Sequence, residues 1–90
     1  MTVIVREYDS QYAVCKALDK KYNDIEFFGS HDIQGNIMIS ETSEGTFICE
    51  SFEDNTDCRK CEMYPDTKDE HKHTIYMKVT KVIGDDWVGK

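Results

Sequence analysis

Two cysteines and two histidines in the second half of the chain have the spacing of metal ligands. Cys58 and Cys61 form a C-x2-C pair, and His71 and His73 follow with one residue between them. Cysteines at this spacing can place both sulfurs on one zinc ion, and alternate side chains of an extended segment point to the same side. The sequence therefore allows a tetrahedral Cys2His2 site, and zinc is the one cofactor that it suggests.

Two other interpretations of these four residues stay open. The spacing differs from the usual zinc-finger pattern, and Cys61 is followed by Glu62 instead of glycine, so surface thiols with solvent-facing histidines are the competing interpretation. A redox dithiol requires surroundings that lower a thiol pKa, and an acidic segment opposes this. The remaining cysteines, Cys15 and Cys49, are expected to be small core residues, and we expect no disulfide.

The net charge of −7 is concentrated in residues 41–70. This segment holds ten acidic residues against three basic ones, whereas the other sixty residues hold eight of each. The acidic residues are Glu41, Glu44, Glu50, Glu53, Asp54, Asp57, Glu62, Asp66, Asp69 and Glu70. Direct nucleic-acid binding is disfavoured, because it requires clustered Lys and Arg. The segment either solvates a loop or offers a surface to a basic partner, which we expect to be a nucleic-acid-binding protein.

Carboxylates on a strand and its flanking loop could approximate a row of DNA phosphates, since alternate strand residues lie about 6.6 Å apart. In size, acidity and lack of catalytic motifs, the chain resembles small phage proteins that inhibit host nucleases or nucleoid proteins by mimicking DNA. The residues behind this resemblance are Glu50, Glu53, Asp54, Asp57, Asp69 and Glu70. The resemblance is one of size and charge, without a shared motif. It implies an anti-restriction type of inhibitor, a homodimer that extends the charged face, and partners among restriction or chromatin-like proteins.

Several function classes lack support in the sequence. It contains no P-loop, G-x-S-x-G, H-E-x-x-H or dinucleotide-binding motif, so we do not expect an enzyme. No apolar run approaches the roughly 18 residues of a membrane span, and Arg6 and Glu7 follow directly on the short apolar run at the start. We expect a cytoplasmic protein, in the host cytoplasm if it is viral, without a membrane partner.

The elements that must position these residues follow from hydrophobic periodicity and turn residues. We expect a single domain over residues 1–90, with an amphipathic helix over 11–22 that is capped by Asp9 or Ser10. Strands are predicted at residues 2–7, 25–28, 36–41, 46–52 and 73–83. The predicted fold is α+β, with one amphipathic helix packed on a mostly antiparallel sheet of four to five strands.

Residues 53–72 are left as a long acidic loop with hardly an aliphatic side chain. A loop of this length is usually functional or pinned by something, which a zinc ion would do. Phe52, Tyr64 and Trp87 lie in or near polar stretches and are candidate interface anchors. His31, in a Gly-Ser-His-Asp sequence, is expected in a surface turn.

Overall fold

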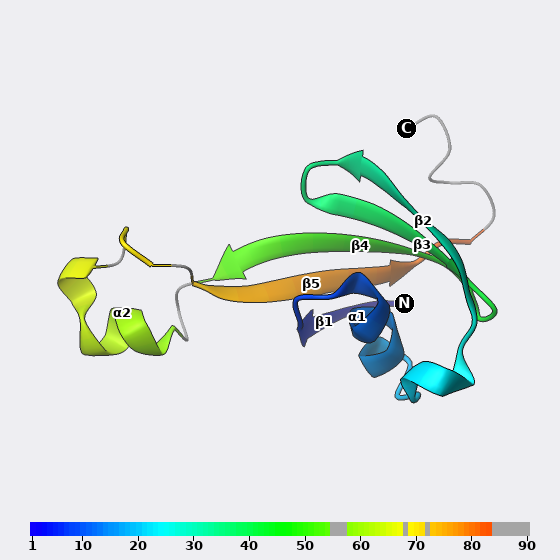
Figure 1. Cartoon of the computed structure of the whole chain (residues 1–90), viewed down its shortest axis with the longest axis horizontal. Helices are drawn as coiled ribbons and strands as arrows, with labels where there is room; N and C mark the ends of the chain where they lie inside the picture. Colours follow the sequence, from blue (N-terminus) through cyan, green and yellow to red (C-terminus); the bar gives the residue numbers. More distant parts are fainter. Residues whose placement is uncertain (55–57, 68, 72, 84–90) are drawn as a thin grey trace.

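Five antiparallel strands form one sheet, and a helix covers part of one of its faces (Figure 1). The structure is a computed structural model that describes residues 1–54, 58–67, 69–71 and 73–83. The strands are β1 (Thr2–Arg6), β2 (Phe27–Gln34), β3 (Ile37–Thr42), β4 (Gly45–Asp54) and β5 (Thr74–Lys81). Their order in the sheet is β1-β5-β4-β3-β2. The predicted α+β class is confirmed.

The strands β2, β3 and β4 are consecutive hairpins, and β5 then inserts between β4 and β1. The β3–β4 turn depends on Gly45, whose φ of 120° suits glycine because it lacks a Cβ. The Thr42 hydroxyl accepts a hydrogen bond from the Glu44 backbone N–H at 3.1 Å and donates one to the Gly45 carbonyl at 2.9 Å. This turn sets the register in which β3 and β4 pair.

The core lies between the sheet and helix α1 (Ser10–Ala17). Alternate residues of each strand point to the same face, so Phe47 and Cys49 of β4 and Val79 of β5 share the face that α1 covers. The buried cluster consists of Ala13, Val14, Phe47, Cys49, Met77 and Val79. Cys15 and Cys49 are both buried, as predicted.

Helix α1 begins where the sequence predicts and ends earlier. The Asp9 carboxylate caps it by accepting the Gln11 backbone N–H at 2.8 Å. The helix stops at Ala17, because Asp19 takes a left-handed conformation with φ of 54°. Tyr22, predicted to lie on the helix, belongs instead to a 3-10 helix η1 (Tyr22–Asp24), where it stacks on Phe27 with ring centroids 5.5 Å apart.

Strand β2 is longer than predicted, since it continues past Gly29 to Gln34. His31 therefore lies on this strand, where it is exposed, and not in a turn. The register of β2 against β3 shifts between Phe27 and Gly29 and again between Asp32 and Gln34. Because β2 is an edge strand, polar residues and bulges are tolerated along it.

The segment predicted as a long loop contains secondary structure. Its described part forms a short helix α2 (Arg59–Met63) and a 3-10 helix η2 (Pro65–Thr67). Strand β4 also runs two residues further than predicted, to Asp54, and pairs with the start of β5 at Thr74. Among the described residues, no helix has the length and apolar character needed to cross a membrane.

Candidate metal centre

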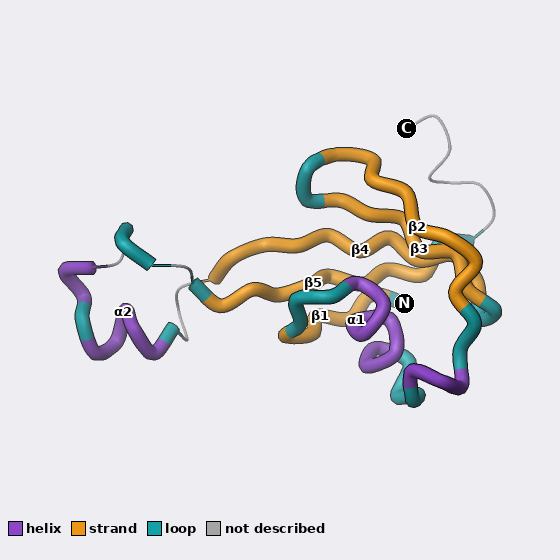
Figure 2. The backbone as a smooth tube through the Cα atoms, viewed as in Figure 1, coloured by secondary structure: helices purple, strands orange, loops and turns teal. Residues whose placement is uncertain are grey.

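A projecting unit lies at the end of the β4–β5 hairpin, away from the rest of the sheet (Figure 1). We call this unit, the described residues between Cys58 and His73, the Cys2His2 lobe. The two strands that carry it pair up to their ends, where Asp54 is opposite Thr74. His73 directly precedes β5, so one of the four candidate ligands is fixed to the sheet. The backbone trace in Figure 2 shows α2 at the far end of this hairpin.

Local hydrogen bonds place the two cysteines on the same side of the first turn of α2. Cys58 is the N-cap residue, and its carbonyl accepts the Glu62 backbone N–H at 3.1 Å. The Tyr64 N–H donates to the Lys60 carbonyl at 2.8 Å and closes the helix. Residues three apart are neighbours on a helical turn, so Cys58 and Cys61 direct their sulfurs to one point.

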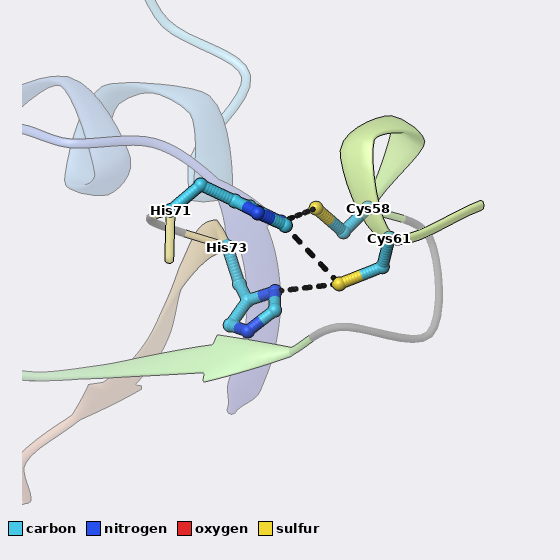
Figure 3. Close-up of side chains that lie close together, drawn as sticks. All are labelled: Cys58, Cys61, His71 and His73. Atoms are coloured by element: carbon cyan, nitrogen blue, oxygen red, sulfur yellow. Dashed lines mark hydrogen bonds between the residues drawn. The ribbon is translucent and has the colours of Figure 1, made fainter. Parts of the chain in front are cut away.

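The sulfurs meet the imidazoles of both histidines (Figure 3). His71 Nε2 lies 3.4 Å from Cys58 Sγ and 3.3 Å from Cys61 Sγ. His73 Nδ1 lies 3.2 Å from Cys61 Sγ. All four ligand atoms are within 4.8 Å of one another.

These separations fit a tetrahedral zinc site. With Zn–S bonds of about 2.3 Å and Zn–N bonds of about 2.0 Å, tetrahedral angles place sulfur and nitrogen about 3.5 Å apart. The sulfur–nitrogen distances of 3.2 to 3.4 Å are a few tenths of an ångström shorter. The ligand set of two thiols and two imidazoles is also one that zinc prefers.

The electrostatics of Cys58 suit a metal ligand. The backbone N–H of Cys61, and after it the His73 side chain, stabilise the thiolate and lower the pKa of Cys58 to about 6. A thiol binds zinc as the thiolate, so this residue is already in its binding form at neutral pH. Cys58 is also buried, which shields its sulfur from water, whereas the other three candidate ligands are partly exposed.

The lobe has no apolar core among its described residues. Met63 is 67% exposed and Tyr64 is 58% exposed, and α2 packs mainly on η2. The described backbone bonds within the lobe are local, such as Thr67 N–H to Tyr64 carbonyl at 3.0 Å. Hydrophobic burial therefore does not explain its fold, whereas a metal ion held by the four residues would cross-link α2 to the segment before β5.

Two of the ten acidic residues lie at the end of β4 that is opposite to the lobe. Glu41 contacts the His31 imidazole at 3.0 Å, and Glu44 pairs with Lys20. Both flank the β3–β4 turn, and β4 then runs ten residues to Asp54, a length of about 30 Å. These two carboxylates therefore do not join those of the lobe.

The other carboxylates also divide. Glu50 and Glu53 point to opposite faces of β4, and Glu50 is opposite Lys78 of β5. Asp57 lies outside the described residues. The described carboxylates thus form separate groups and not one face. Those that gather on the lobe are all exposed: Glu62, Asp66, Asp69 and Glu70.

Sequence reasoning found the four candidate ligands and named Phe52 as a candidate anchor, but it missed Tyr76 and Met63. Phe52 and Tyr76 face each other across β4 and β5 near the base of the lobe, with ring centroids 5.6 Å apart. The exposed Met63 was also missed, although its place beside Tyr64 in a polar stretch is a usable signal. Trp87, the remaining candidate anchor, lies outside the described residues.

No protein-family model matches this chain, and no curated protein or solved structure is significantly similar to it.

Proposed function

We propose that this protein is a zinc-stabilised protein-interaction module. The observation that carries the proposal is the convergence of Cys58, Cys61, His71 and His73, whose ligand atoms all lie within 4.8 Å of one another. Four protein ligands complete a tetrahedral shell and leave no position for a reactive water, which is the arrangement of structural zinc sites. We therefore propose that the metal folds the lobe and that the protein is not an enzyme.

The partner that we propose is a basic protein surface, such as that of a nucleic-acid-binding protein. The lobe presents four exposed carboxylates, and the exposed Met63 and Tyr64 offer apolar contacts beside them. Acidic groups of this kind give fast, salt-sensitive association with basic surfaces. By covering such a surface, the module would act as a blocking protein without itself binding nucleic acid or membrane. Reduced zinc-bound thiols suit a cytoplasmic protein, in a host cell if the chain is viral.

Metal analysis tests the zinc site. Protein purified without added chelator should contain about one equivalent of zinc by elemental analysis, and Co²⁺ should replace it with the visible absorption of a tetrahedral thiolate site. The His71→Ala and Cys61→Ser variants should lose the metal. His31→Ala, which removes an exposed histidine outside the lobe, is the matched control and should keep it. Metal-free protein with an ordered lobe would contradict the proposal.

Binding to a basic probe tests the proposed partner chemistry. Zinc-loaded protein should bind a fluorescent peptide rich in arginine and lysine, with affinity that falls as salt rises. Reversing Glu62 and Asp66 to lysine should abolish binding while zinc content stays unchanged. Reversing Asp24 and Glu26, exposed acidic residues outside the lobe, should have little effect. Equal losses from the two pairs would show that only net charge matters and would exclude the lobe as the binding surface.

A further inference from the structure

Among the described residues β1 pairs with β5 alone, so it forms one edge of the sheet. In an antiparallel ladder, directly opposite residues alternate between pairs that exchange hydrogen bonds and pairs that do not. The Lys81 N–H donates to the Met1 carbonyl at 3.0 Å, and Val3 and Val5 follow in the same alternation against β5. The backbone N–H and C=O groups of the residues between them therefore point away from the sheet. These residues are Thr2, Ile4 and Arg6.

In the described part of the chain, this edge has no bulge, and its one charged residue is Arg6 at the end of the strand. The register of β1 is continuous over all five residues, without a bulge, and Ile4 is 61% exposed. The other edge strand, β2, has two register shifts and carries exposed polar residues. Bulges and inserted charges discourage edge-to-edge pairing, so β2 is better protected than β1.

We propose that β1 pairs with β1 of a second copy of this chain, antiparallel and with the two-fold axis at Ile4. The five-stranded sheets then join into one continuous sheet. In this register Ile4 is opposite the second copy's Ile4, and Thr2 is opposite the second copy's Arg6. Each such pair exchanges two backbone hydrogen bonds, so all the outward groups of the three residues find partners.

The side chains of β1 are compatible with antiparallel pairing to a second copy of the strand. Centring the pairing on Ile4 places the aliphatic side chains of Val3 and Val5 together and sets no two like charges opposite each other. Registers centred on Val3 or Val5 would leave the outward groups of Arg6 or Thr2 without a partner in β1, and one centred on Arg6 would oppose two guanidinium groups.

The dimer does not depend on the zinc site, because β1 lies at the sheet edge and the lobe projects from the β4–β5 hairpin (Figure 1). The two-fold axis would direct the two lobes in opposite directions along the joined sheet. A basic partner with two sites could then be held by both lobes, which raises the overall affinity without new contacts.

Sedimentation of the full zinc-loaded chain tests this pairing. The weight-average mass should rise from 10.5 kDa toward twice that value with increasing concentration. Ile4→Lys opposes two ammonium groups at the two-fold axis and should raise the midpoint concentration at least about tenfold, which corresponds to about 1.4 kcal/mol. Ile33→Lys, at a half-exposed position of β2, is the matched control and should dimerise like the parent. A monomeric parent, or an Ile4→Lys variant that still dimerises, would overturn the proposal.

Disulfide trapping keeps the test decisive if Ile4→Lys does not fold. In the proposed register the two Cα atoms at position 4 are about 5.5 Å apart, within the range of a disulfide. Ile4→Cys should therefore give a covalent dimer on mild oxidation, identified as a 4–4 linked peptide by mass spectrometry. Thr2→Cys places its counterpart about 15 Å away and should not cross-link. Equal cross-linking of both variants would exclude the register.

Discussion

At the residue scale, the cysteines differ according to the groups that surround them. Burial raises the pKa of Cys49 to about 11 and also raises the pKa of Cys15. Hydrogen bonding from the Cys61 backbone, followed by His73, lowers the pKa of Cys58 to about 6. Only the thiolate is nucleophilic, so these surroundings separate core thiols from a lobe thiol that is ready to react.

Alkylation of metal-free protein with iodoacetamide should modify Cys58 well before Cys15 or Cys49, because removing the metal exposes the lobe thiol while the other two thiols stay buried in the core. At pH 7 a thiol of pKa about 6 is about 90% ionised, against about 1% for a thiol of pKa 9. Its thiolate is less basic and therefore less reactive, so the net alkylation rate is about four times that of the thiol of pKa 9. These figures hold while the Cys61 N–H and His73 still bond the Cys58 sulfur, and the rate should then drop about tenfold between pH 7 and pH 5. An unfolded lobe, whose thiol has an ordinary pKa, should show a drop of about a hundredfold.

Peptide mass spectrometry at timed intervals gives the rate at each cysteine. Adding zinc before the reagent should protect Cys58, whereas Cys49 should stay unmodified with or without the metal. Faster labelling of Cys49 than of Cys58 in folded protein would contradict the assigned surroundings.

The core makes a second residue-scale prediction. Phe47 is completely buried beneath α1, whereas Phe28, on the neighbouring part of the sheet, is 66% exposed. Phe47→Ala should lower the free energy of unfolding by about 3 to 5 kcal/mol, because it removes a large side chain and leaves a cavity. Phe28→Ala should cost less than about 1 kcal/mol. Urea unfolding followed by circular dichroism measures both, and similar losses would show that Phe28 is covered in solution.

At the element scale, the sheet and the lobe have different sources of stability. The sheet and α1 share a buried apolar cluster, while the lobe has exposed Met63 and Tyr64 and its four candidate ligands. Metal removal should therefore unfold the lobe and leave the sheet folded. Amide hydrogen exchange should accelerate at Glu62, Tyr64 and Thr67, whose N–H groups donate within the lobe, and stay slow at Phe47 and Val79.

Chelator treatment followed by exchange mass spectrometry checks this division. Returning zinc should restore protection in the wild-type chain but not in Cys61→Ser. Faster amide exchange throughout β4 and β5 would instead mean that the metal stabilises the whole fold. Unchanged exchange in the lobe would mean that the metal does not stabilise the lobe.

The element scale also explains what the sequence could predict. The start of α1 was predictable because the Asp9 cap is a local signal, and β5 because Met77 and Val79 alternate with the exposed Lys78. The length of β2 was not, because residues beyond Gly29 are extended through pairing with β3, a non-local contact. The ligand spacing identified the candidate site, but it could not reveal α2, a short polar helix without an apolar stripe.

At the scale of the whole molecule, the carboxylates are distributed according to strand direction, which the sequence alone does not give. Glu44 lies in the β3–β4 turn just before β4, and Asp54 lies at the other end of β4. Glu50 and Glu53 lie on opposite faces of the same strand. The molecule is elongated, with extents of 45 × 31 × 20 Å. Its net charge of −7 therefore acts as distributed self-repulsion, to which the lobe contributes four exposed carboxylates beside the basic Arg59 and Lys60.

This distribution predicts that salt stabilises the zinc-loaded protein. Raising NaCl from about 10 to about 300 mM shortens the screening length from about 30 Å to about 6 Å, which weakens repulsion among carboxylates. The Tm should rise by several degrees, since 1 kcal/mol corresponds to about 4 to 8 °C for a domain of this size. The paired variant Glu62→Gln with Asp66→Asn should flatten the dependence. Glu41→Gln, which removes a carboxylate beside His31, should flatten it less. Calorimetry at fixed pH and zinc concentration gives Tm against salt for the parent and both variants. A Tm that falls with salt would mean that ion pairs such as Lys16–Glu7, 2.5 Å apart, outweigh the repulsion among carboxylates.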